Sequence, residues 1–356
     1  MPAQGPDVPV PTFEVLVNGS ALSAVAAAAH VVQVSIEEDT ELPGMFSLEI
    51  VASDDLDDQF LWIDDEDLFS VGDSVEVKLG YADQLTSLFK GEITGLEPSF
   101  NADRLPSLVV RGYDRRHRLA RGRRTRSFLK KKDSDIAAQI AREAGLTANA
   151  TDSGVTHDYV LQADRTDFEF LLERASRINY EVVVEDKTLN FRPVANGAGE
   201  VLTLKADEDL VEFNPRLSSA GQVSDVSVRG WDPKNKKEIV GKSQSGDEVS
   251  TMGGKQAGAA LSKKAFGAAT GLLSRTPVAA QAEADQIAVA RLNSASLELI
   301  TGEAVCGGRV DLRPGKVVKI DGVGKRFGGQ YYVTAAAHVI TSDGYSTRFS
   351  FRRNAL

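Results

Sequence analysis

The sequence predicts an α+β protein that is mainly β, with two antiparallel β domains and a small α/β insert between them. Short runs that alternate apolar and polar residues fill residues 13–112, with no helical period among them. Two amphipathic helical patterns and a hairpin pattern appear within 113–195, and strand patterns resume near residue 201. We therefore expect three domains, with the boundaries 1–112, 113–198 and 199–356.

Strand patterns at short intervals favour a sandwich or barrel for the first domain. The first run ends in Asn18-Gly19, a dipeptide that favours the positive φ angles of tight turns. The next run alternates apolar and polar residues at Val32, Val34 and Ile36. The runs are, in order, FEVLVNG, VVQVSIEED, FSLEIVAS, SVEVKLGY, SLFKGEITGLEP and SLVVRGYD.

The first helix of the α/β insert is expected over residues 133–145. It places Ile136, Ile140 and Ala144 on one face, has Asp133 or Ser134 as a cap, and ends at Gly145.

A second helix is expected to begin at Thr166, because Glu169 three positions later completes a capping box. The apolar stripe of this helix consists of Phe168, Leu171, Leu172, Ala175 and Ile178. The segment that follows, YEVVVE-DK-TLNFRP, has the pattern of a hairpin against which the stripe would pack.

The third domain is expected to contain strands at VLTLKA and VSDVSVRGWD, followed by an irregular segment. Residues 241–275 are rich in Lys, Gly, Ser and Ala without a sustained period, so we expect a long mobile loop there. A helix is expected near 277–293, with Pro277 at its first position. The closing strands are LELITGEAVC, KVVKIDG, GQYYVTAAAHVI and STRFSFRR.

The composition excludes several classes of protein. Lys and Arg number 41 and Asp and Glu 51, so the net charge of −10 argues against a chain that coats nucleic acid or an anionic membrane. The single cysteine, Cys306, cannot form an internal disulfide, and four scattered histidines do not match a zinc cluster. The N-terminus has no basic and apolar leader, so we expect synthesis in a bacterial cytoplasm and no membrane anchor.

Catalytic motifs are absent from the sequence: it holds no HExxH, GxSxG or CxxC. The Gly-rich stretch 322–329 has strand patterns on both sides, whereas a dinucleotide-binding loop is followed by a helix. We interpret the stretch as a hairpin turn. We expect no catalytic residues, no cofactor and no metal site.

An acidic run lies within residues 54–67, which hold eight carboxylates. Their spacing does not match an EF-hand, which needs alternating ligands, a Gly and a final Glu. We interpret the run as a solvated loop or an acidic docking loop. Its candidate contact residues are Asp54, Asp55, Asp57, Asp58, Asp64, Asp65 and Asp67.

A basic segment, residues 111–132, carries a net charge of +10 and leaves −20 for the other residues. Such a segment could bind nucleic acid, but Tyr113 and Phe128 are its only aromatic residues, and single-strand binding uses several stacking rings. We favour contact with a neighbouring subunit, because complementary charge sets the register between subunits. The candidate contact residues are Arg115, Arg116, Arg118, Arg121, Arg123, Arg124 and Arg126.

Several blocks in series resemble the phage late control gene D family and the N-terminal hub portion of VgrG proteins. The blocks are VGDSVEVKLGY, LFKGEITGLEPSF, LPSLVVRGYDRRHRLARG, YVLQADRTDFEFLLERASRINYEVVVEDKTLNF and LRPGKVVKIDGVGKRFGGQYYVTAAAHVITSDGYSTRFSFRRNA. The resemblance covers nearly the whole chain, and residues 235–280 match least. It rests on the order of the blocks, since no single motif is diagnostic.

The resemblance implies a baseplate hub of a contractile phage tail or injection system, with two tail-tube-like β-barrel domains per subunit. Three subunits would form a homotrimeric ring that joins a sixfold tail tube protein to a threefold central spike protein, among other baseplate components. VgrG proteins continue into a needle, whereas this chain ends at Leu356, so the spike is expected to be a separate polypeptide or a missing part of a longer one.

A non-catalytic structural protein of a virion tail or injection particle is the expectation, with nucleic acid only as passing cargo. Two alternatives remain open, a hub-associated peptidoglycan hydrolase and a channel protein that contacts nucleic acid.

Overall fold

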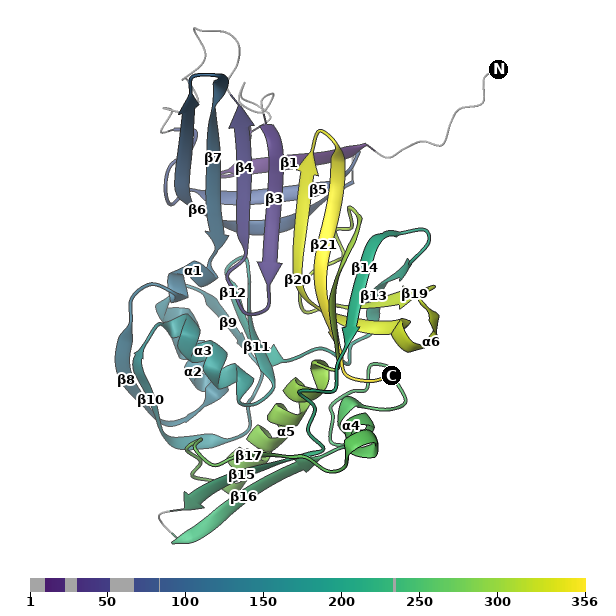
Figure 1. The fold of residues 1–356 in the computed structure, drawn as a ribbon. Coiled ribbons are helices and arrows are strands. Elements are labelled where there is room, and N and C mark those ends of the chain that lie inside the picture. The colour runs from purple at the N-terminus through teal and green to yellow at the C-terminus, as the bar shows by residue number, and fades with distance from the viewer. Residues whose placement is uncertain (1–9, 23–30, 52–66, 83, 233–234) are drawn as a thin grey trace.

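The computed structural model describes residues 10–22, 31–51, 67–82, 84–232 and 235–356. A large sheet forms the upper part of the molecule in Figure 1, and two smaller α/β units lie below it. The large sheet has 13 strands within the described residues, and the fold is mainly β, as the sequence predicts.

The first half of the large sheet comes from the N-terminal third of the chain. Apolar residues at alternate positions face one buried cluster, which includes Val34, Ile36, Phe46 and Leu48. The predicted strands are all present, and Asn18 and Gly19 have the positive φ angles expected of the first turn. The strands are Pro11–Val17 (β1), Ser20–Ala21 (β2), Val31–Asp39 (β3), Met45–Val51 (β4), Ser74–Tyr81 (β5), Gln84–Asn101 (β6) and Arg104–Asp114 (β7).

The second half comes from the end of the chain. A four-residue helix, Gly324–Phe327 (α6), joins two of its antiparallel strands, so the predicted turn at the Gly-rich stretch is confirmed and contains a helical turn. The strands are Glu200–Lys205 (β13), Leu210–Leu217 (β14), Ile300–Gly307 (β18), Val317–Asp321 (β19), Gly329–Thr341 (β20) and Gly344–Arg353 (β21).

The second half repeats the strand order of the first. The first half runs β1-β5-β6-β7-β4-β3, and the second runs β13-β19-β20-β21-β18-β14. Taken in chain order, the six strands of one half correspond one by one to those of the other, with β14 in the place of β3 and β20 in the place of β6. One pair differs in direction, since β1 and β5 are antiparallel whereas β13 and β19 are parallel.

The two halves join through β3 and β20, which pair antiparallel with Ile36 opposite His338. The N-terminal part of β20 pairs instead with β19 of its own half. Because β20 serves both halves, the described residues form one open sheet, and the predicted closed barrels are not present among them. The strand β1 lies against β20 but pairs with β2 and β5.

The predicted α/β insert follows β7. Its second and third helices and its hairpin lie where the sequence predicts them, and Phe168, Leu171 and Ala175 are buried against the hairpin strands. The first predicted cap is wrong: Lys132 is the N-cap of α2, and Asp135 accepts its backbone N–H. The elements are Arg116–Leu119 (α1), Arg124–Lys132 (β8), Asp133–Glu143 (α2), Thr147–Ala150 (β9), Thr156–Arg165 (β10), Asp167–Ser176 (α3), Tyr180–Glu185 (β11) and Thr188–Pro193 (β12).

A second α/β unit lies between β14 and β18. The long loop predicted for residues 241–275 is wrong, because this stretch contains helix α4, strand β17 and the buried Met252. The helix predicted to begin at Pro277 begins at Gln281 instead, with Ala280 as its N-cap. The elements are Asp225–Asp232 (β15), Lys237–Gln244 (β16), Gly258–Phe266 (α4), Thr270–Leu273 (β17) and Gln281–Leu297 (α5).

No helix within the described ranges has the length and apolar character needed to cross a membrane.

Candidate assembly interface

Eight strands of the large sheet form an uninterrupted run, β14-β18-β21-β20-β3-β4-β7-β6. The face of this run that points away from the buried clusters is turned toward the viewer in Figure 1. One row across five strands holds Tyr113, Met45, Glu37, Ala337 and Arg348, each opposite the next in the strand register. Both halves of the repeat therefore contribute to one continuous face.

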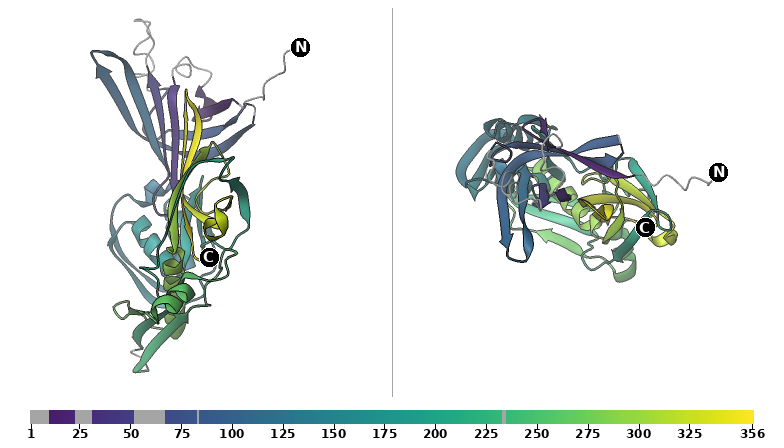
Figure 2. Two further views of the ribbon diagram at one scale, coloured as in Figure 1. Left: turned by 45° about the vertical axis from the view of Figure 1, so that its right-hand side comes forward. Right: turned by 90° about the horizontal axis from the view of Figure 1, so that it is seen from above.

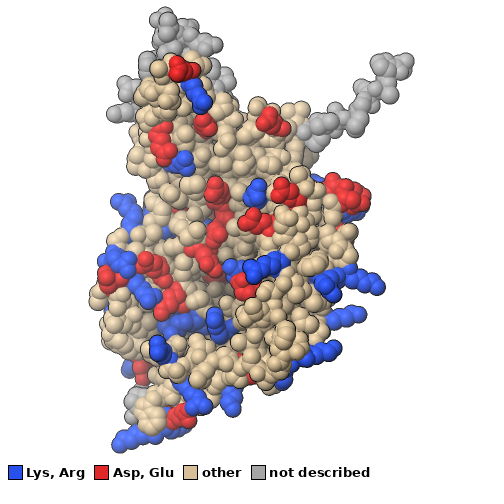
Figure 3. Space-filling model, viewed as in Figure 1, with Lys and Arg blue, Asp and Glu red and all other residues tan. Residues whose placement is uncertain are grey.

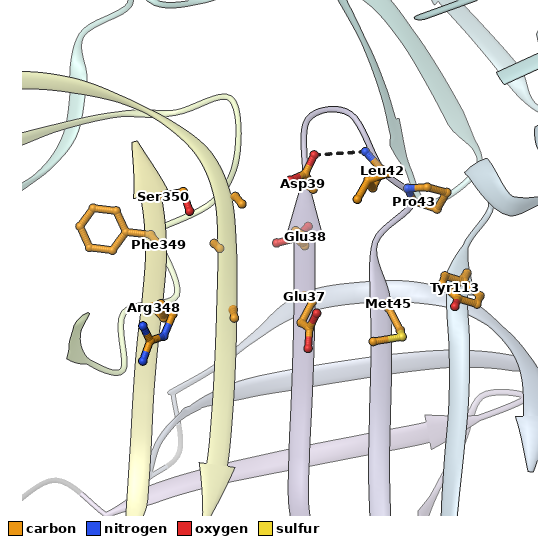
Figure 4. Close-up of a pocket in the computed structure, with 13 residues that line it drawn as sticks. Glu37, Glu38, Asp39, Leu42, Pro43, Met45, Tyr113, Arg348, Phe349 and Ser350 are labelled. Carbon is orange, nitrogen blue, oxygen red and sulfur yellow. Dashed lines mark hydrogen bonds between the residues drawn. The ribbon is translucent and has the colours of Figure 1, made fainter. Parts of the chain in front are cut away.

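A shallow pocket of about 400 Å³ lies on this face where the two halves join. Figure 4 shows its lining from the ends of β3, β4, β7 and β21, with Leu42 in the β3–β4 turn beside Asp39. The Leu42 backbone N–H donates to Asp39 Oδ1 at 3.1 Å, which holds that turn. Ala335, Ala336 and Ala337 of β20 also line the pocket, and the small side chains of Ala335 and Ala337 on this face leave room for the hollow.

The neighbouring row of the same face carries small hydroxyl side chains. Ser35 lies opposite Ser47, and their hydroxyls are 3.3 Å apart. Ser346 lies opposite Val339, which lies opposite Ser35. The centre of the face is therefore smooth and polar, with few large apolar groups for a partner to bury.

Two strands end the eight-strand run. At one end, the C-terminal half of β6 pairs with β7 on one side, and at the other, β14 pairs with β18 on one side. Within the described residues neither has a partner on its outer side. Each edge carries one proline, Pro98 or Pro215, which disfavours indiscriminate strand pairing.

The first three candidate contact arginines of the basic segment hold the insert to the first half of the sheet. Arg116 donates from Nε to Asp114 Oδ2 at 2.9 Å and from Nη1 to the Asp39 carbonyl oxygen at 2.9 Å. Arg115 and Arg118 both pair with the buried Glu92. Burial raises the pKa of Glu92, but hydrogen bonds from Arg118 and His117 outweigh it and hold that pKa below its usual value.

The later arginines brace the insert internally. Arg126 donates to Asp167 Oδ1 at 2.7 Å and also pairs with Glu143. Arg124 pairs with the same two carboxylates, and Arg123 pairs with Asp164 and Glu169. Within the described part of the chain, Arg121 is exposed and has no ion pair. Six of the seven candidate contact arginines thus have carboxylate partners in their own chain, and a subunit contact by any of them stays a prediction.

A buried charge cluster links the insert to the second α/β unit. The cluster consists of Asp133, His157, Arg174, Arg177 and Glu283. Arg174 Nε donates to Asp133 Oδ1 at 2.5 Å, and Arg177 Nη2 donates to Glu283 Oε1 at 3.0 Å. Burial raises the pKa of Asp133, but hydrogen bonds from His157 and Arg174 hold it below the usual value. These contacts fix the two units against each other.

The acidic docking loop lies outside the described residues except for Asp67, which is exposed. The N-terminal 112 residues as a whole contain 21 acidic and four basic residues. In Figure 3 acidic side chains gather over the upper and middle parts of this face, and basic ones project from its lower and right-hand edges. The two ends of the molecule therefore differ in charge.

A metal site requires several ligating side chains close together, and a reactive cysteine requires a thiol that can ionise. No three His, Cys, Asp or Glu side chains there form a group that could hold a metal ion. Cys306 is buried, and burial raises the pKa of its thiol to about 12, so the thiol stays protonated at neutral pH.

A family model described as the Alg8 N-terminal domain matches residues 7–342. The chain belongs to the Alg8 N-terminal domain family. The matching model is not that of the late control gene D or VgrG family, so the narrower resemblance stays a prediction. No curated protein matches this Alg8 N-terminal domain chain in sequence.

Solved structures of phage tail proteins share the fold of this Alg8 N-terminal domain chain. The 43 kDa tail protein of prophage MuSo2 from Shewanella oneidensis aligns with a TM-score of 0.72 at 12% identity, over 96% of this chain and 98% of that one. A tail protein from Neisseria meningitidis aligns with a TM-score of 0.66 at 16% identity, over 97% of both chains.

A third structure is the c3393 protein of E. coli, a component of the type VI secretion system with structural similarity to bacteriophage T4 tail proteins. It aligns with a TM-score of 0.59 at 13% identity, over 96% of this chain and 77% of that one. At these identities the likeness shows a shared fold, and it confirms the mainly β tail-protein architecture expected from the sequence.

Sequence reasoning missed the repeat and both free edges. The strand β14 carries Pro215 and alternates poorly, and β8 is so rich in Arg and Lys that its strand pattern is hidden. The usable signal was charge: each arginine of the segment could have been matched with carboxylates such as Glu92, Glu143 and Asp167, but only the fold brings them together.

Proposed function

We propose that this chain is a structural, non-catalytic hub subunit of a contractile phage tail or injection system. Three copies form a ring that joins a sixfold tail tube to a threefold central spike. The observation that carries the proposal is the internal repeat, whose two halves join through β3 and β20.

The pairing of β3 with β20 within the chain indicates how two copies of the chain could pair. In the repeat, β14 corresponds to β3 and β6 corresponds to β20. The strands β14 and β6 are the two edges of the eight-strand run. The β14 edge of one copy can therefore meet the β6 edge of the next as β3 meets β20 within the chain. Such a head-to-tail contact produces a ring when the rotation closes. Three chains contribute six repeats, the number that a sixfold partner needs.

The placement of the two α/β units supports the binding of different partners at the upper and lower ends of the molecule. The insert follows the end of β7, and the second unit follows the end of β14, and both lie at the lower end of the sheet in Figure 1. The insert lies between the two halves, whereas the second unit interrupts the second half, so the lower end repeats three times around a trimer. The upper end includes the β6–β7 turn and the β20–β21 turn, which correspond in the repeat, and it is the better match for the sixfold tube.

The face of the eight-strand run that points away from the buried clusters is suited to form the wall of a channel. Small side chains such as Ser35, Ser47 and Ala337 dominate its centre. These small side chains offer few large apolar groups on which passing cargo would be held, and charged side chains of the same face, such as Arg348 and Glu303, pair with each other. The proposal places this face toward the ring axis, with assembly in the bacterial cytoplasm and other baseplate components around it.

The mass of the purified protein in solution tests the proposal. Native mass spectrometry is expected to give three times the chain mass of 38.2 kDa, and electron microscopy along the ring axis is expected to show six lobes with threefold symmetry. A protein that stays monomeric at every concentration and joins neither a tail tube nor a spike would overturn the proposal.

A further inference from the structure

The ribbon of β8 and β10 carries apolar side chains on its solvent side. Leu129, Tyr159 and Leu161 are 63%, 58% and 48% exposed. Tyr159 lies directly opposite Leu129 in the strand register, and Leu161 lies diagonal to Leu129. The three side chains therefore form one contiguous apolar patch, which we call the ribbon patch.

The two faces of the ribbon have different roles. On the inner face Phe128 and Val160 are buried against α2 and α3, and Arg126 pairs with carboxylates of the insert. Among the described residues β8 and β10 pair only with each other, so both outer edges of the ribbon also lack partners. Open edges beside exposed apolar side chains are a surface that proteins normally cover.

The position of the ribbon patch indicates what covers it. In Figures 1 and 2 the ribbon lies on the same flank of the molecule as the free edge of β6. In the proposed ring this flank of each copy faces the β14 flank of the next copy. That opposite flank has exposed apolar residues of its own, Val201 on β13 and Val211 on β14.

We propose that the ribbon patch is a second contact of the ring, buried against the β14 flank of an adjacent copy of this chain. The inference rests on the proposed function, because the ring sets which flanks meet. It also changes the role expected for the basic segment: its arginines hold the insert together, and the apolar outer face of β8 makes the contact between subunits.

Substitution of the patch tests the contact. The triple variant L129S/Y159S/L161S removes the apolar surface at exposed positions, so the fold is expected to persist and is checked by circular dichroism. Because a tenfold change in a dissociation constant corresponds to only about 1.4 kcal/mol, shared here among three positions, we expect the dissociation constant of the trimer to rise by about tenfold or more. The matched control is W231S, which removes an exposed aromatic residue from β15, outside the ribbon.

Hydrogen exchange gives a second measurement that does not depend on a variant. We expect the backbone amides of β8 and β10 to exchange more slowly in the wild-type trimer than in dissociated protein. A triple variant whose trimer has the wild-type dissociation constant, or a ribbon with no protection in the trimer, would overturn the ribbon contact and leave the proposed ring intact. A wild-type protein that never forms a trimer would overturn the ring itself.

Discussion

Asp114 lies where β7 leaves the large sheet, and its carboxylate receives hydrogen bonds from three directions. The Gly44 N–H donates to Oδ2 at 2.6 Å, the Arg116 N–H donates to Oδ1 at 2.8 Å, and Arg116 Nε donates to Oδ2 at 2.9 Å. The side chains of Asp114 and Arg116 are both buried. A buried pair of this kind is costly to break, because the remaining charge is left without a partner.

Arg116→Ala tests this anchor. We expect the free energy of unfolding to fall by about 3 kcal/mol, because Asp114 stays buried without its guanidinium. Urea denaturation measures the change. Arg121→Ala is the matched control, and this exposed arginine is expected to change stability by less than about 0.5 kcal/mol. Equal effects of the two variants would show that Arg116 has no anchoring role.

His338 is the buried histidine at the joint between the two halves. Its Nδ1 lies 2.9 Å from the Tyr345 hydroxyl and its Nε2 lies 3.0 Å from the Leu312 carbonyl oxygen, and Leu312 O can accept only from a protonated Nε2. Burial, aided by the charge of Arg313, lowers the pKa of His338 to about 4. The imidazole is therefore neutral in the folded protein at neutral pH.

This lowered pKa predicts a loss of stability in acid. Between about pH 6.5 and pH 4 the unfolded chain binds a proton at His338 and the folded chain does not, so acidification favours unfolding by up to ~3 kcal/mol. Urea denaturation at several pH values is the measurement. In His338→Gln the dependence on pH should be weaker over this range than in the wild type, and identical pH profiles would contradict the assignment.

At the scale of elements, the approach of α5 to β16 depends on the absence of a side chain. A Cβ atom at Gly241 would lie 2.3 Å from the backbone carbonyl carbon and oxygen of Ala284. Helix α5 and strand β16 therefore lie closer together than a residue with a side chain at position 241 would allow. The helix covers one face of the β15–β16 pair through Ile287 and Leu292.

Gly241→Ala should force these elements apart. Overpacking of a closed contact typically costs 1–3 kcal/mol, so we expect the free energy of unfolding to fall by about 2 kcal/mol or more. Gly221→Ala is the control, because no atom lies within 4 Å of the position that its Cβ would take. Thermal unfolding of the two variants side by side would settle the point, and a Gly241 variant as stable as the control would refute the close approach.

At the scale of the whole molecule, the open sheet has two edges, on β6 and β14, that lack a strand partner among the described residues. In the proposed ring these edges meet between copies. The edge of β6 ends near Phe100, which is 58% exposed. A positive charge on an edge strand disfavours pairing with a second strand. Together with the ribbon patch, the edges should therefore control ring formation.

Phe100→Lys is predicted to weaken the trimer while leaving the folded subunit intact. We expect the dissociation constant to rise by about tenfold, measured by analytical ultracentrifugation over a dilution series. Phe266→Lys adds the same charge at an exposed phenylalanine of α4, 78% exposed and outside the strand joint, and it should leave the trimer unchanged. If both variants behaved alike, the β6 edge would not be the joint.

The sequence by itself determined those features that depend on neighbours along the chain. Alternation of apolar residues predicted β3 and β5 to the residue, and the capping box from Thr166 to Glu169 and the β11–β12 hairpin are present as expected. These features are local, because side chains alternate across a strand and a cap acts within one turn of helix. Where charge or small residues hide that periodicity, as in β8 and residues 241–275, the prediction failed.

The tertiary structure alone decided how the halves combine and what the charged residues contact. The joint of β3 with β20 pairs residues such as Ile36 and His338 from opposite ends of the chain. This strand pairing brings the first and third predicted domains into one sheet. The domain boundaries at residues 112 and 198 stay a prediction. The partner of Arg115 on the β11–β12 turn, Asp186, also lies far along the chain, 71 residues away. Charge and pattern specify which groups need partners, but only the packing of distant strands determines which partners they find.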